Sequence, residues 1–188
     1  MSPTTFLADE SWLPCFQHAV ALAFLCAEWG KVPMFGDRRI VDDPDLTDAV
    51  ENNVRALLFW SIREPLLRLI PANTQWFEVK HLRECHFAQL RAINHPVWNS
   101  PDDLNELEKV AARKPESLRG PAGTLVPAIL WGHNRQGPFT IIEGNHRMSA
   151  LAGSNTERGG CTLPVFAGLS AELCVWHLPD VPALRAQG

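Results

Sequence analysis

Four short apolar segments in the second half of the chain constrain the fold most. They cover residues 125–130, 139–142, 162–167 and 173–178, and turn-forming residues lie between them. An apolar run of this length, bounded by turn signals, is typical of a buried strand. Residues 76–82 alternate roughly between apolar and polar side chains, which indicates a further strand. The second half therefore predicts several short strands around one core.

Helical patterns lie before and between these strands. Apolar side chains at helical spacing predict a helix over residues 44–60, with Asp43 as its cap and Pro44 in its first turn. The sequence from Ser100 to Asp103 is a strong helix start and predicts a helix over 101–113. A short helix is expected over 145–152. Together with the strands, these helices predict the α+β fold class.

The charge distribution suggests a boundary near residue 75. Residues 1–75 hold six basic and ten acidic side chains, whereas residues 76–188 hold eleven of each. We interpret residues 1–75 as a helical N-terminal extension and residues 76–188 as the mixed domain. A chain of 188 residues has the size of one ordinary domain, so we expect the two parts to form one compact unit.

An apolar stretch from Trp12 to Trp29 is expected to be a buried or partner-covered helix. It is too short and too polar to span a membrane, although a peripheral contact with the inner face of the bacterial inner membrane remains an alternative. Asp9 and Glu10 precede it, so we expect no secretory signal. The five cysteines form no Cys-x-x-Cys pair, which favours a reduced, cytoplasmic location.

The overall charge excludes a protein held to DNA by general basicity, because the net charge is −4 and the pI about 6.0. Residues 109–147 nevertheless hold six basic and two acidic side chains. This local excess predicts DNA contacts, and a solvated face of mixed charge is the alternative. Trp98 and Trp131 would either stack on bases or belong to the core. The candidate DNA-binding residues are Arg113, Lys114, Arg119 and Arg135.

The segment Ile141–Leu151 carries the strongest chemical signal. An apolar strand meets Gly144 and passes directly into a helix, so the free N–H groups of the helix start can bind an anion. Arg147 adds a forked cation, and His146 can exchange protons near neutral pH. Glu143 could hold a divalent metal or orient a water. A purely structural strand–glycine–helix turn is the alternative interpretation.

Magnesium is the metal that carboxylate oxygens would suit here. Glu78 and Glu84 could join Glu143 as ligands if the strand over 76–82 lies beside the motif. The chain contains no Walker A loop, so a nucleotide site would not be a P-loop.

The sequence Glu-Gly-Asn-His-Arg-Met-Ser-Ala-Leu from Glu143 resembles the Gly-x-x-Arg signature of the ParB/sulfiredoxin superfamily. The order of strands and helices over about residues 75–180 is also similar to that superfamily. This resemblance implies the fold of the superfamily, a mixed sheet with flanking helices, here with a helical N-terminal extension. The resemblance implies that this turn binds nucleotide phosphates, usually with Mg²⁺. It implies a phosphate corner made by Gly144, Asn145, His146 and Arg147, with Arg83 as a supporting arginine.

Two departures narrow the resemblance. Sulfiredoxin carries a reactive cysteine before the histidine of the motif, where this chain has Asn145, so we do not expect thiol repair chemistry. A chromosome-partitioning ParB also carries a helix-turn-helix region and a dimerisation tail, and 41 residues after Arg147 leave no room for both.

The size, the acidic N-terminal part and the position of the motif are similar to the plasmid fertility-inhibition proteins of the oncogenic-suppression type. That resemblance implies ATP hydrolysis and DNA cleavage that block transfer of DNA by a type IV secretion system, with Glu143, His146 and Arg147 as catalytic residues. Two alternatives remain open. The chain could be a ParB-like kinase of free serine, or a non-catalytic protein whose helices over 12–70 bind a secretion coupling ATPase.

Overall fold

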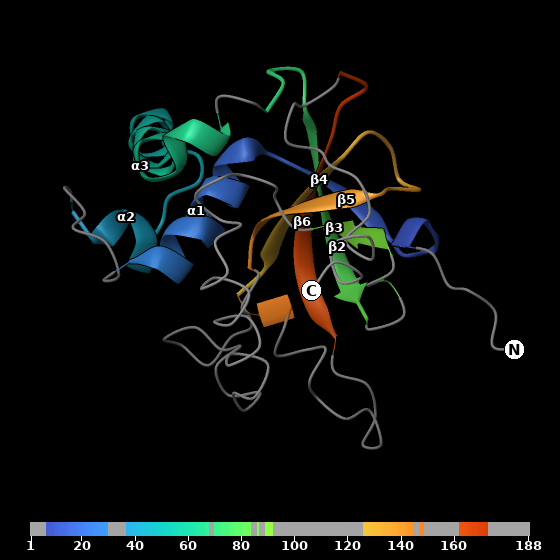
Figure 1. The fold of residues 1–188 in the computed structure, drawn as a ribbon. Coiled ribbons are helices and arrows are strands. Elements are labelled where there is room, and N and C mark those ends of the chain that lie inside the picture. Colours follow the sequence, from blue (N-terminus) through green and yellow to red (C-terminus); the bar gives the residue numbers. More distant parts are fainter. Residues whose placement is uncertain are drawn as a thin grey trace, which may run out of the picture.

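The chain folds as an α+β protein around a mixed sheet, as the sequence predicts (Figure 1). We analysed a computed structural model. It describes residues 7–29, 37–67, 70–83, 86, 89–91, 126–144, 147–148 and 162–172.

The sheet has six strands in the order β1-β2-β6-β4-β5-β3. Strands β4 and β6 pair in parallel, as do β3 and β5, and the other neighbours are antiparallel. The bounds are β1 Trp12–Cys15, β2 Gln75–Leu82, β3 Leu90–Arg91, β4 Ala128–Gly132, β5 Phe139–Glu143 and β6 Leu163–Leu169.

Strand β4 is buried along its whole length and separates two hydrophobic clusters. Ala128 and Leu130 belong to the cluster on one face of the sheet, whereas Ile129 and Trp131 belong to the cluster on the other. This alternation follows from the two-residue period of a strand. A strand that is covered on both faces has apolar side chains at successive positions. The apolar run over residues 125–130 predicts β4 for this reason.

Three helices lie together to one side of the sheet (Figure 1). They are α1 Gln17–Glu28, α2 Arg39–Asp42 and α3 Ala49–Leu67. Phe24 of α1 and Phe59 of α3 pack with ring centroids 4.8 Å apart, in the same cluster as Trp131. None of the helices in the described part of the chain combines the length and the apolarity that a membrane crossing requires.

The prediction of one helix from Trp12 to Trp29 is wrong for its first residues. Trp12–Cys15 forms β1, which pairs with β2, and α1 starts only at Gln17. Pro14 and β-favouring side chains explain the difference, since proline disrupts a helix interior but is accepted in an edge strand. The segments 1–75 and 76–188 therefore contribute to the same sheet.

Helix α3 begins later than predicted and turns its apolar stripe outward. Asp48, not Asp43, caps the helix, because its Oδ1 accepts hydrogen bonds from the N–H groups of Val50 at 2.7 Å and Glu51 at 3.2 Å. Val50 is 72% exposed and Leu57 is 70% exposed. The spacing correctly predicted a helix, but the apolar side chains that show it lie on the surface and not in the core.

The buried side of α3 instead holds an ion pair. Arg55 is fully buried, pairs with Glu51, and donates from Nε to the carbonyl oxygen of Ile40 at 2.7 Å. Glu51 also accepts from Arg39 at 2.9 Å. These contacts fix the segment from α2 to α3, because each partner satisfies a group that would otherwise be buried unpaired.

Most of the remaining strand predictions agree with the structure. Other predicted elements lie outside the described residues. Strands were correctly predicted over 76–82, 139–142 and 162–167, whereas the strand predicted over 125–130 is shifted toward the C-terminus. The two-residue strand β3 was missed. The helix predicted over 101–113 and the strand predicted over 173–178 lie outside the described residues.

Removing Glu51 should test the buried pair. Glu51→Ala leaves the Arg55 guanidinium buried without its carboxylate, so the free energy of unfolding should fall by about 3–5 kcal/mol. Asp42→Ala is the matched control, because the Arg38–Asp42 pair has both side chains 56% exposed and should contribute at most about 1 kcal/mol. Urea unfolding followed by tryptophan fluorescence measures both. Equal losses would show that the buried pair does not organise this segment.

Candidate nucleotide-phosphate corner

The motif forms a sharp corner at the end of β5. The strand ends at Glu143, and Gly144 turns the chain with φ of +103°. The N–H of Met148 donates to the carbonyl oxygen of Gly144 at 2.9 Å, and Arg147 and Met148 are helical. The strand–glycine–helix transition inferred from the sequence is therefore present.

Gly144 is required at this corner for two reasons. Its positive φ is disfavoured for residues with a side chain. A Cβ at this position would also lie 2.7 Å from Cβ of Ala128 and 3.1 Å from Nη2 of Arg147. The corner therefore brings its backbone directly against β4 and against the guanidinium of Arg147.

Arg147 folds back over Gly144 into the protein and is 8% exposed. Its Nη2 donates to the carbonyl oxygen of Pro127 at 3.3 Å and lies 3.8 Å from Oε1 of Glu143. Its Nε is buried and has no hydrogen-bond partner among the described residues. The contacts with Pro127 and Glu143 are both long for a buried cation, which is costly to leave incompletely paired.

The electrostatics of the corner combine desolvation with two carboxylates. Burial lowers the pKa of Arg147, and the charges of Glu143 and Glu28 oppose that shift. Glu28 ends α1 and is buried. Sequence reasoning missed this residue, although it is the only acidic residue in the apolar stretch Trp12–Trp29. An acid inside such a stretch is a signal for a buried cationic partner.

The metal prediction rests on Glu143 alone among the described residues. Strand β2, which holds Glu78, is separated from β5 by β6 and β4. Three strand spacings are about 14 Å, so Glu78 does not share a site with Glu143. Glu84 lies outside the described residues. Because Mg²⁺ is often bound by one or two carboxylates together with substrate phosphates, Glu143 still fits a metal that arrives with a nucleotide.

Arg83 lies at the same end of the sheet as the corner but in a different cluster. It follows β2, and its Nη2 is 3.6 Å from Oε1 of Glu10. Its N–H donates to Nδ1 of His86 at 3.2 Å. His86 is fully buried, and burial lowers its pKa. The structure therefore does not bring Arg83 to Gly144, and a role beside the phosphate corner remains a prediction.

The other predicted site residues divide into two groups. Arg135 lies at the opposite end of β5, with its guanidinium carbon 5.3 Å from the ring centroid of Trp12 and 5.2 Å from that of Phe77. Trp131 is fully buried, so it belongs to the core and does not stack on bases. Residues outside the described part of the chain include Trp98, Arg113, Lys114, Arg119, Asn145 and His146.

The two described cysteines are poor nucleophiles. Cys15 and Cys26 are free, and burial raises the pKa of Cys15 to about 11 and also raises that of Cys26. Because the thiolate is the reactive form, these two groups are mostly inert at neutral pH.

Comparison of the chain with protein-family models, with curated proteins and with solved structures returns no match.

The close approach at Gly144 can be separated from its backbone strain. Gly144→Ala should lower the free energy of unfolding by about 1–3 kcal/mol, because the new Cβ meets Ala128 and the positive φ becomes strained. Adding Ala128→Gly should relieve the contact but leave the strained φ. The loss caused by Gly144→Ala should therefore be smaller in the Ala128→Gly background than in the wild type. Urea unfolding of the four proteins measures both parts. No loss in Gly144→Ala would contradict the tight corner.

Proposed function

We propose that this chain is a nucleotide-hydrolysing, DNA-cleaving member of the ParB/sulfiredoxin superfamily, of the plasmid fertility-inhibition type. In this proposal it blocks transfer of DNA by a competing type IV secretion system, in conjugation or T-DNA export. The observation that carries the proposal is the corner at Gly144, where a strand turns directly into a helix beside a buried, incompletely paired arginine.

The state of Arg147 supports an anionic ligand at this corner. Its buried Nε lacks a hydrogen-bond partner among the described residues, and its Nη2 lies 3.8 Å from Oε1 of Glu143. A phosphate oxygen would supply the shorter, charge-assisted contacts that a guanidinium fork favours. The first N–H groups of the following helix, which also carry partial positive charge, would donate further hydrogen bonds to the phosphate.

Hydrolysis would need charge stabilisation and a positioned water. In the proposed reaction, a water attacks the γ-phosphorus of ATP, the bond to the ADP oxygen breaks, and phosphate and a proton are released. Arg147 would stabilise the charge on the phosphoryl oxygens, and His146 would assist from the same turn. Glu143, which ends β5 beside this turn, would orient the water or hold Mg²⁺. When bound, Mg²⁺ neutralises phosphate charge.

Conservative substitutions at the corner should test this proposal. Arg147→Lys keeps the charge but loses the fork, and Glu143→Gln keeps the size but loses the carboxylate. Each should lower the rate of ATP hydrolysis by about 100-fold or more, while urea unfolding shows that the variants are folded. Arg38→Gln, which changes an exposed arginine at the start of α2, should retain the wild-type rate.

The assay follows ATP hydrolysis and plasmid nicking with Mg²⁺ present or chelated. Activities that need the metal and vanish in both folded corner variants would support one phosphate corner for the effector. ATP consumption only when free serine is added would instead favour the kinase. A wild-type protein that neither hydrolyses ATP nor nicks DNA would overturn the proposed enzyme.

The outward face of α3 favours a second candidate function, a protein that binds a secretion coupling ATPase. Val50, Val54 and Leu57 of α3 and Leu46, which precedes the helix, are all exposed and follow helical spacing. An exposed apolar stripe of this kind is typical of a protein contact. Residues 37–58 hold six acidic and three basic side chains, so the stripe would suit a partner segment with basic residues around an apolar face.

Acidic substitutions on this stripe should separate the two functions. Val50→Asp with Leu57→Asp should abolish inhibition of DNA transfer in cells if binding is the main activity, while ATP hydrolysis stays within about twofold of wild type. Both positions are exposed, so the fold should tolerate the change. Lys80→Asp, an exposed change that shifts the net charge by the same amount, is the control. Retained inhibition in the double variant would exclude the stripe as the effector surface.

A further inference from the structure

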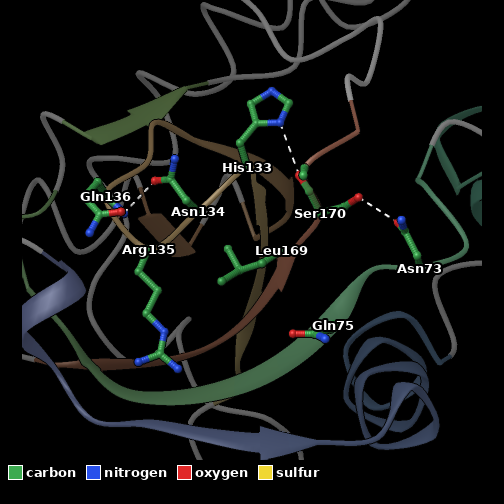
Figure 2. A pocket seen from close by; sticks show the side chains of 9 residues that line it. Asn73, Gln75, His133, Asn134, Arg135, Gln136, Leu169 and Ser170 are labelled. Atoms are coloured by element: carbon green, nitrogen blue, oxygen red, sulfur yellow. Dashed lines mark hydrogen bonds between the residues drawn. The ribbon is translucent and has the colours of Figure 1, made fainter.

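A polar pocket lies at the end of the sheet opposite to Gly144. It opens where the loop between β4 and β5 lies beside the start of β2 and the end of β6, and its volume is about 600 Å³. Figure 2 shows Leu169 near the centre, with polar side chains from the loop and from Asn73 to Gln75 around it.

The length of β5 separates this pocket from the phosphate corner. The strand runs from Phe139, which follows the pocket loop, to Glu143, which precedes Gly144. Its five residues span about 14 Å at the rise of an antiparallel strand. A small ligand in the pocket therefore cannot also contact Gly144 and Arg147.

Arg135 provides the pocket with a cation that aromatic rings hold in place. Its guanidinium carbon lies 5.3 Å from the ring centroid of Trp12 and 5.2 Å from that of Phe77. These contacts orient the cation but leave its charge uncompensated. No carboxylate forms an ion pair with Arg135 among the described residues, and none of the described residues that line the pocket is acidic. Glu172, which follows the lining residue Ala171, has its Oε1 held by the amide nitrogen of Asn73 at 2.7 Å, so it is the Arg135 end of the pocket that favours an anion.

The remaining lining groups combine donors and acceptors. Nδ1 of His133 lies 3.2 Å from the carbonyl oxygen of Ser170 and must be the donor there, because a carbonyl oxygen accepts. The side chain of Asn73 accepts from Oγ of Ser170 at 2.7 Å and is fixed by this contact. Oδ1 of Asn134 accepts from the N–H of Gln136 at 2.9 Å, which directs its amide nitrogen away from the loop backbone.

Gln75 offers the least constrained hydrogen-bonding group. Its side chain is exposed and makes no hydrogen bond within the described part of the chain. A primary amide presents a donor and an acceptor side by side, which matches the edge of a nucleobase. Leu169 gives the same space an apolar wall for the face of a base.

We propose that this pocket binds one nucleotide of single-stranded DNA, with a phosphate on Arg135 and the base beside Gln75, Asn134 and Leu169. A single strand is required because the bases of a duplex are stacked inside and cannot enter a pocket. The assignment rests on the proposed DNA-cleaving function and adds that the DNA contact and the ATP corner lie at opposite ends of β5.

Fluorescence anisotropy of a labelled 12-nucleotide single strand should test the pocket on the full chain without ATP. Arg135→Gln should weaken binding about tenfold. It should also reduce the dependence of log affinity on log salt by about 0.7, the contribution of one phosphate contact on a single strand. Arg135→Lys should keep that salt dependence. Gln75→Ala should weaken binding about threefold with an unchanged salt dependence.

Two controls separate the pocket from general charge and from folding. Arg38→Gln removes an arginine that is 56% exposed and should leave affinity unchanged. Urea unfolding checks Arg135→Gln, since this variant also loses its contacts with Trp12 and Phe77.

The outcomes distinguish this assignment from the proposed function. If wild-type protein fails to bind the strand, or if Arg147→Lys weakens binding and Arg135→Gln does not, the pocket assignment is overturned while ATP hydrolysis can still stand. If deoxythymidine monophosphate binds as tightly as the strand and with the same need for Arg135, the pocket takes free nucleotides and the single-strand assignment fails. Arg135-dependent binding of the strand without any ATP hydrolysis would support the pocket and overturn the proposed function.

Discussion

The parallel pairing of β4 with β6 is the interaction on which the rest of the structure depends. It joins residues 128–132 to residues 165–169, so it places the two apolar strands of the second half at the centre of the sheet. Because β4 is buried on both faces, the fold must supply two separate apolar layers. Helices α1 and α3 contribute to one layer, and the outer strands and Met148 contribute to the other.

The corner at Gly144 is a direct result of this pairing. Strand β5 lies antiparallel to β4, and its end stands beside Ala128, the first residue of β4. The chain can turn there only if no side chain separates its backbone from Ala128. The same approach presses the guanidinium of Arg147 against the start of β4. Burial of that cation is thus a consequence of strand packing, and the proposed binding of an anion at the corner depends on it.

Local signals predicted the strands and the corner well, because these elements follow short patterns in the sequence. A run such as Ile141–Glu143 before a glycine is compatible with few local structures other than a strand that ends in a turn. The start of the chain was harder, since Trp12–Cys15 joins the sheet only through pairing with β2, more than 60 residues away in sequence. No local pattern reports a partner at that distance. The outward direction of the α3 stripe could not be predicted for a related reason: spacing reveals a face, but the buried Glu51–Arg55 pair decides which face is inside. Distances within the site, including the separation of Arg83 from Gly144, depend on strand order and not on neighbouring residues.

The edges of the described sheet have a consequence for how molecules of this protein meet one another. The first edge is β1, four residues that include Pro14, and the other is β3, with two residues. A proline offers no N–H to an incoming strand, and two residues provide too little backbone for a stable ladder. Among the described strands, neither edge therefore offers a good template for the addition of a strand from another copy. Edge-to-edge growth of the described sheet into fibrils is disfavoured in this way.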